Sequence, residues 1–178
     1  LSAFSCGGGN KANSTSEQSE ETAVNVPQFD ADSAYLYVKN QVDFGPRVPN
    51  TKEHVACGNY LAGQLEAFGA QVTNQYADLI AYDGTLLKAR NIIGSYKPES
   101  KKRIALFAHW DTRPWADNDP DEKNHNTPIL GANDGASGVG ALLEIARLVN
   151  QQQPELGIDI ILLDAEDYGA PQFYTGQH

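Results

Sequence analysis

The sequence is poor in the residues that mark several common classes of protein. Only two cysteines, Cys6 and Cys57, occur among 178 residues, so neither a disulfide framework nor a thiolate metal site with paired spacing is expected. Basic residues number 13 against 23 acidic ones, and the net charge of -10 argues against nucleic-acid binding. No apolar run approaches the roughly 20 residues that a membrane-spanning helix needs. Any metal in this chain must therefore be bound through nitrogen and oxygen.

The first 26 residues differ in composition from the rest. They begin with the small and apolar run Leu1-Ser2-Ala3-Phe4-Ser5-Cys6 and continue with a polar stretch that has almost no large apolar side chain to bury. The run resembles the end of a bacterial lipoprotein signal, with Cys6 as the lipidated residue. We expect residues 1–26 to be a lipoprotein-like N-terminus and a disordered tether, which places the protein in the bacterial periplasm or cell envelope. A leftover segment with a free cysteine is the alternative.

Residues 27–178 have the pattern of a globular α/β domain. A helix is predicted from Asp32-Ser33 to about Lys39, and a second begins at Asn50 or Thr51 and ends before Gly69. The dipeptide Asp83-Gly84 between two apolar stretches predicts a β-hairpin.

Two apolar runs without alternation, residues 104–108 and 158–163, are typical of central strands covered on both faces. Between them, residues 135–151 have apolar side chains at helical spacing. This strand–helix–strand order predicts a right-handed crossover. We therefore expect a three-layer α/β fold with a mixed, largely parallel central sheet flanked by helices.

Polar residues with ligand chemistry stand at the ends of these predicted elements. His109 and Asp111 follow the first buried strand, Asp134 precedes the helix, and Glu166 and Asp167 follow the second buried strand. Carboxyl ends of neighbouring strands meet at one edge of an open α/β sheet. Catalytic zinc is bound by imidazole nitrogen and carboxylate oxygen with one position left open. The pattern therefore predicts a zinc site in which one of the adjacent acids binds metal and the other transfers protons.

Each of these residues taken alone also has an ordinary structural interpretation. A His-x-Asp pair is common in surface turns, an aspartate before a helix is usually a cap, and acids after a strand are often solvated. The joint pattern favours a site, because polar groups packed beside two buried strands are costly unless they are paired or metal-bound.

Three segments carry a resemblance to a known family. Residues 108–117 (AHWDTRPWAD), 131–138 (GANDGASG) and 164–167 (DAED) resemble the zinc aminopeptidase superfamily, and more closely its bacterial-type glutaminyl cyclase (glutaminyl-peptide cyclotransferase) branch. Residues 45–49 and 91–94 are similar to entry segments of the same family. The likeness extends over nearly all of residues 27–167.

The resemblance implies a role for each matching residue. Asp134 and Asp167 match the acidic zinc ligands, and Glu166 matches the general acid/base. His109 matches a ligand to a second metal in the aminopeptidases, whereas the cyclases generally hold a single zinc. Asp111 matches a supporting carboxylate that orients the site.

The resemblance also implies a further histidine ligand from a late strand. His54, His125 and His178 do not match it. We therefore expect residues 27–178 to be the N-terminal part of a longer cyclase-like or aminopeptidase-like domain, truncated before its C-terminal strands and helices, and inactive on its own.

The activity implied for the complete protein is zinc-dependent conversion of N-terminal glutaminyl residues of peptides to pyroglutamyl residues, with release of ammonia. A two-zinc aminopeptidase and a lipid-anchored, non-catalytic binding protein of the same fold are the alternatives. Trp110 and Trp115 are candidates for a substrate pocket, with packing beside the strand end as the other interpretation.

Overall fold

The computed structural model describes residues 25–171. Cys6 and nearly all of the predicted tether lie outside the described residues, so the lipid anchor and the envelope localisation stay predictions. No helix among residues 25–171 is long and apolar enough to cross a bilayer.

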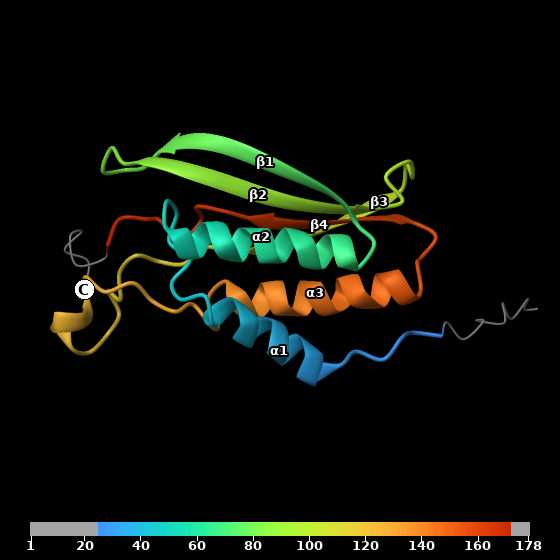
Figure 1. Ribbon diagram of the computed structural model, residues 1–178, viewed down its shortest axis with the longest axis horizontal. Helices are drawn as coiled ribbons and strands as arrows, with labels where there is room; N and C mark the ends of the chain where they lie inside the picture. Colours follow the sequence, from blue (N-terminus) through green and yellow to red (C-terminus); the bar gives the residue numbers. More distant parts are fainter. Residues whose placement is uncertain (1–24, 172–178) are drawn as a thin grey trace, which may run out of the picture.

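The described residues form an α/β fold in which a mixed sheet packs against helices (Figure 1). In chain order the elements are α1 (Ala31–Val42), α2 (Lys52–Ala67), β1 (Gln71–Ile80), β2 (Leu86–Tyr96), β3 (Arg103–His109), the 3-10 turn η1 (Glu122–Asn124), α3 (Ala136–Gln151) and β4 (Gly157–Leu163).

The sheet has the strand order β1-β2-β4-β3. The predicted hairpin at Asp83-Gly84 joins β1 to β2, with Ile80 opposite Leu86. The predicted crossover also forms, because α3 connects β3 to its parallel neighbour β4. The mixed sheet is thus confirmed. Among residues 25–171, however, the pairings β1–β2 and β2–β4 are antiparallel, since a tight hairpin reverses the chain and a short turn leads from β2 into β3.

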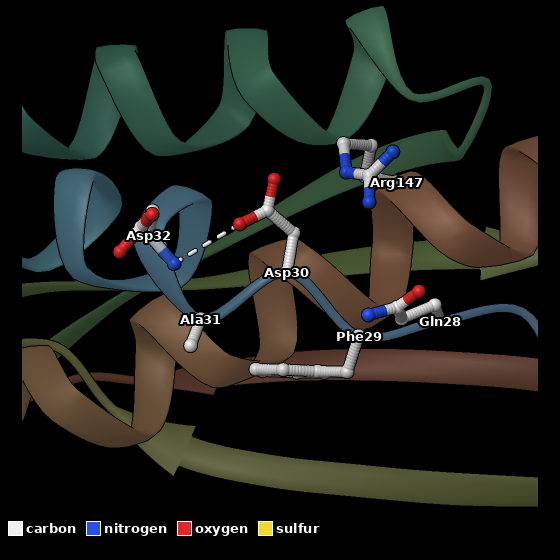
Figure 2. Close-up of a pocket in the computed structure, with 6 residues that line it drawn as sticks. All are labelled: Gln28, Phe29, Asp30, Ala31, Asp32 and Arg147. Carbon is white, nitrogen blue, oxygen red and sulfur yellow. Dashed lines mark hydrogen bonds between the residues drawn. The ribbon is translucent and has the colours of Figure 1, made fainter.

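Both early helices are capped at their first turn. The side chain of Asp30 accepts the N–H groups of Asp32 and Ser33 at 3.0 and 3.1 Å, so α1 begins slightly before the predicted residue. Figure 2 shows this cap at a surface hollow that Arg147 of α3 also lines. Thr51 caps α2 by accepting the N–H of His54. Each cap satisfies a backbone donor that has no partner within the helix.

The helices lie on one face of the sheet within the described residues. Figure 1 shows α2 and α3 side by side beneath the strands, with α1 packed against α3. Alternate residues of β4, Ile158, Ile160 and Leu162, point into this layer and are buried. The other apolar side chains that are completely buried are those of Cys57, Leu61, Leu65, Ile92, Trp110, Ala136, Val139, Leu143 and Ala146.

Strand β3 differs from the expectation that both of its faces are covered. Ile104 and Phe107 are exposed, because β3 is the edge strand among the described residues and helices cover only one face. The carboxyl ends of β3 and β4 nevertheless lie side by side, since Ala108 pairs with Leu162 and His109 with Leu163. This register places the residues that follow the two strands next to each other.

Candidate metal centre and active site

The candidate site lies at the carboxyl ends of β3 and β4, beside the first turn of α3. One ligand atom from each of His109, Asp134 and Asp167 can be chosen so that all three atoms lie within 4.8 Å of one another. The three motifs found in the sequence therefore meet at one edge of the sheet. Asp134 and Asp167 come together although 33 positions separate them, because the α3 crossover returns the chain to the strand beside β3.

His109 is the last residue of β3 and occupies the middle of the cluster. Its Nε2 lies 3.0 Å from Oδ1 of Asp134, while its Nδ1 lies 3.5 Å from Oδ1 of Asp111 and 3.8 Å from Oε2 of Glu166. The Nδ1 atom is buried and forms no hydrogen bond of ordinary geometry. The ring is thus surrounded by carboxylates from three segments of the chain.

The turn before α3 brings Asp134 to His109. Gly135, which follows it, has φ +88°, a conformation that glycine adopts without the steric cost a side chain would add. A Cβ at Gly135 would lie 2.9 Å from the carbonyl oxygen of Asp111 and 3.2 Å from Cε1 of His109. Glycine at this position therefore allows the turn to pass directly over the end of β3.

The turn after β4 is attached to the end of β3 through one carboxylate. Asp111, fully buried, accepts the N–H of Glu166 at 3.2 Å and that of Asp167 at 3.0 Å. Arg113 donates to the carbonyl oxygen of Asp167 at 3.2 Å. The two adjacent acids consequently differ in setting: Asp167 is buried, whereas the side chain of Glu166 is 60% exposed.

The electrostatics of the cluster follow from its surplus of carboxylates. The interaction with the Asp111 carboxylate raises the pKa of His109 to about 9, and the charges of Glu166 and Asp134 add smaller effects in the same direction. Burial of the ring opposes this rise. Burial is the main reason why the pKa of Asp167 is raised to about 6, and repulsion from the charges of Asp134 and Asp111 adds to it. Negative charge is therefore concentrated where a cation would relieve it.

The residues present fit a zinc ion. The Oδ2 atom of Asp167 is buried and has no hydrogen-bond partner, which is costly for a carboxylate unless a cation is bound. Imidazole nitrogen and carboxylate oxygen are ordinary zinc donors. Asp134, Asp167 and His109 could therefore hold such an ion between them.

The two tryptophans of the first motif occupy different environments. Trp110 is fully buried, packs in the core and donates its indole N–H to the carbonyl oxygen of Arg90 at 3.2 Å. It does not line the site, because its side chain follows the alternation of β3 into the helix layer. Trp115 is partly exposed, and a hollow of about 270 Å³ is lined by both Trp115 and Asp134. Of the two tryptophans, Trp115 is therefore the one that lines the hollow beside the cluster.

Two structural residues of the site were not found from the sequence. Arg47 is fully buried and donates to the carbonyl oxygens of Trp110, Leu130 and Gly131 at 3.1, 2.7 and 2.9 Å. It thereby ties the end of β3 to the segment that precedes Asp134. His54, which does not match the missing histidine ligand, is buried and contacts Asp164. A signal for Asp164 did exist, because it directly follows a buried strand.

Comparison with known proteins identifies the class to which this site belongs. Residues 91–178 match peptidase family M28. A solved structure named as a Zn-dependent exopeptidase from Parabacteroides distasonis is 64% identical, with a TM-score of 0.84, and covers 86% of this chain and 53% of that chain. The chain therefore carries a peptidase M28 domain, and its mixed α/β fold is consistent with that family.

Two structures from Bacteroides thetaiotaomicron are 95% identical to this chain. One is named as a glutaminyl cyclase bound to N-acetylhistamine, with a TM-score of 0.84 and coverage of 86% of this chain and 53% of that chain. The other is named as a leucine aminopeptidase precursor, with a TM-score of 0.85 and coverage of 87% and 53%. The chain thus spans about half the length of these structures. The predicted resemblance to bacterial glutaminyl cyclases is confirmed.

Proposed function

We propose that the complete protein converts the N-terminal glutaminyl residue of peptides to a pyroglutamyl residue and releases ammonia. The observation that carries the proposal is the donor cluster of His109, Asp134 and Asp167 with the exposed carboxylate of Glu166 beside it. The neighbours named as glutaminyl cyclases and as a Zn-dependent exopeptidase support it.

Asp134 and Asp167 would hold the zinc ion, which when bound supplies a Lewis acid for the side-chain carbonyl of the substrate. The α-amine attacks that carbonyl carbon, so a C–N bond forms within the substrate while the bond to the amide nitrogen breaks. Glu166 is exposed and therefore free to take the proton from the attacking amine and return it to the departing ammonia. Asp111 keeps Glu166 in place by accepting its backbone N–H.

The reaction needs a substrate folded back on itself, because both reacting groups belong to one residue. The hollow lined by Trp115 and Asp134 adjoins the cluster through Asp134, and Arg113 and Asp117 line it as well. We assign this hollow to the first residues of the peptide. The apolar ring of Trp115, with charged side chains around it, suits a peptide that begins with a short side chain and continues as polar backbone.

The proposal is tested with the complete protein and a peptide that begins with glutamine. Cyclisation gives a product lighter by one ammonia, measured by mass spectrometry together with ammonia release. The same peptide with an acetylated N-terminus is the control, because its amine cannot attack. Unchanged Gln-initiated peptide in the presence of saturating zinc would contradict the proposed activity.

A two-zinc aminopeptidase is the second candidate, favoured by the proximity of His109 to Asp134 and by the neighbour named as a leucine aminopeptidase precursor. In that case the same assay would release free glutamine. Metal analysis separates the two further, since one zinc per complete chain favours cyclisation and two favour hydrolysis.

A non-catalytic binding protein of the same fold is distinguished by Glu166→Gln. This variant keeps the size of the side chain and removes its basicity, so an enzyme should lose turnover while zinc binding stays within about threefold of the parent. Glu155→Gln is the matched control, because Glu155 is exposed and precedes the amino end of β4, away from the site. Equal turnover in both variants would exclude the role of Glu166.

A further inference from the structure

A buried histidine–aspartate pair lies directly behind the candidate site. The Nε2 atom of His54 in α2 is 2.9 and 2.8 Å from the two carboxylate oxygens of Asp164, the residue that follows β4. The side chains of His54 and Asp164 are 4% and 0% exposed. A carboxylate accepts at both oxygens, so Nε2 carries the proton and donates it. The pair joins residues 110 positions apart in the sequence.

Asp164 fixes the start of the turn that carries the acidic residues of the site. Its carboxylate also accepts the N–H of Arg90 at 2.6 Å and that of Ala165 at 2.7 Å, while its own N–H donates to Oδ1 of Asn91 at 3.0 Å. Ala165 has φ +59°, a left-handed conformation that is unfavourable for alanine. The contacts of Asp164 therefore hold a strained residue immediately before Glu166.

His54 also contacts the other half of the site. Its ring stacks on Trp110, with centroids 4.3 Å apart and an angle of 18° between the planes. Trp110 precedes Asp111, whose carboxylate holds the N–H groups of Glu166 and Asp167. One imidazole thus supports both ends of the same turn: Asp164 by a hydrogen bond, and Asp111 through the stacked indole.

We propose that His54 and Asp164 are a positioning pair that holds the turn after β4 so that Glu166 and Asp167 face His109 and Asp134. The inference rests on the proposed function for its chemical meaning, because a metal ligand and a general base need fixed positions. Neither His54 nor Asp164 touches the reacting atoms. The expected effect of disturbing them is a loosened turn with the rest of the fold retained.

Two substitutions of His54 separate its two contacts. His54→Phe keeps a ring against Trp110 and removes the donor to Asp164, whereas His54→Gln keeps a donor and removes the ring. Tyr60→Phe is the matched control, since Tyr60 lies in the same helix and loses a partly buried hydrogen bond with Asn40 on the side of α1. Asp164→Asn tests the acceptor.

The first measurement is amide hydrogen exchange over residues 165–167 in the complete protein without metal. We expect faster exchange there in His54→Phe and Asp164→Asn, partial recovery in His54→Gln, and unchanged exchange in α3 for all variants. The second measurement is Zn²⁺ affinity by calorimetry, with the Co²⁺ absorption spectrum as a report of ligand geometry. We expect affinity about 10–100-fold lower in His54→Phe than in Tyr60→Phe, with a shifted Co²⁺ spectrum.

A measurement without substitutions covers the case in which His54→Phe does not fold. In the parent chain the Nε2–H signal of His54 in NMR spectra should be protected from solvent exchange and should shift when Zn²⁺ binds. An unmoved signal at saturating Zn²⁺, or unchanged exchange at residues 165–167 in a folded His54→Phe, would overturn the positioning role. If the complete protein binds no Zn²⁺, the metal centre of the proposed function fails, and the exchange data still decide whether the pair holds the turn.

Discussion

The Nε2 atom of His109 lies 3.0 Å from Oδ1 of Asp134, a contact between the last residue of β3 and the turn that begins α3. Asp111 and Glu166 approach the other ring nitrogen of His109 at 3.5 and 3.8 Å. A single imidazole thus lies among several carboxylates. Without a metal, a proton on His109 is the cation that balances them, which is why its pKa is raised to about 9.

This arrangement makes Zn²⁺ binding compete with protons. Asp167, with a pKa raised to about 6, must be deprotonated to bind metal, and His109 must give up its proton if it is a ligand or move aside if it is not. We therefore predict that Zn²⁺ affinity rises with pH up to about pH 6 as Asp167 loses its proton, with proton release on binding. The rise continues toward about pH 9 if His109 is also a ligand. Calorimetry in two buffers of different ionisation enthalpy measures that release. An affinity that is flat between about pH 4 and about pH 6 would contradict the assignment of Asp167.

The carboxylate of Asp167 is predicted to lower the stability of the metal-free chain. Since the folded pKa of Asp167 is about 6 and the unfolded value is about 3.9, the native state binds more protons between these values, and the free energy of unfolding falls as pH rises through this window. His109 acts in the same direction at higher pH: its contribution is fully present below about pH 6.5 and is lost as pH rises through about 9.

Asp167→Asn should therefore stabilise the metal-free chain at pH 8 by on the order of 1–2 kcal/mol and change it little near pH 4, while abolishing stabilisation by Zn²⁺. Urea unfolding with a chelator and with added Zn²⁺ measures both effects. Asp159→Asn is the control of opposite sign, because the hydrogen bond from Arg103 holds the pKa of Asp159 below its usual value. A loss of stability at pH 8 in Asp167→Asn would show that its charge is compensated in the folded chain.

That the site residues lie close together could be predicted from the sequence, because each of them stands next to the end of a predicted strand or helix. His109 and Asp167 each follow an apolar run, and Asp134 precedes an amphipathic helix, so parallel pairing of the two strands was enough to bring them together. The hairpin at Asp83-Gly84 was equally accessible, since its signal is local.

The supporting contacts could not be predicted, because their partners are distant in sequence and carry no pattern. Arg47 donates to three backbone carbonyls, which every residue possesses, and His54 meets Asp164 only after α2 has packed against the sheet. Trp110 and Trp115 occur in one motif, yet only the structure shows that the first packs into the core and the second lines the surface.

Glycine at position 135 is predicted to be required for the site. In Gly135→Ala the new Cβ meets Asp111 and His109 at a backbone conformation that disfavours a side chain, so the turn must move. We expect the free energy of unfolding to fall by about 1–3 kcal/mol and Zn²⁺ affinity to fall with it. Gly63→Ala is the matched control, because Gly63 lies in α2 with open space around its Cβ position and should gain about 0.5–1 kcal/mol. Similar Zn²⁺ affinity in the two variants would show that the turn tolerates displacement.

Loss of Arg47 is predicted to disturb the backbone around the site most, because Arg47 joins the end of β3 to the segment before Asp134. It is fully buried, and replacing it with methionine removes the donor from the buried carbonyl oxygen of Trp110 and from the partly buried one of Leu130. The carbonyl oxygen of Gly131 loses Arg47 but keeps the N–H of Ala136. Each of the two acceptors left without a donor costs roughly 1–3 kcal/mol, so the free energy of unfolding should fall by at least about 2 kcal/mol.

Arg47→Lys retains the charge but presents one ammonium in place of the planar fork, so it should recover only part of that loss. Urea unfolding of the two variants and the parent measures the difference, and Zn²⁺ binding by any folded variant shows whether the segment before Asp134 has moved. Full recovery by lysine would mean that charge rather than the fork holds the three carbonyls. Because the fork spans the end of β3 and Gly131, the geometry requires partial recovery: one ammonium cannot replace both arms at once.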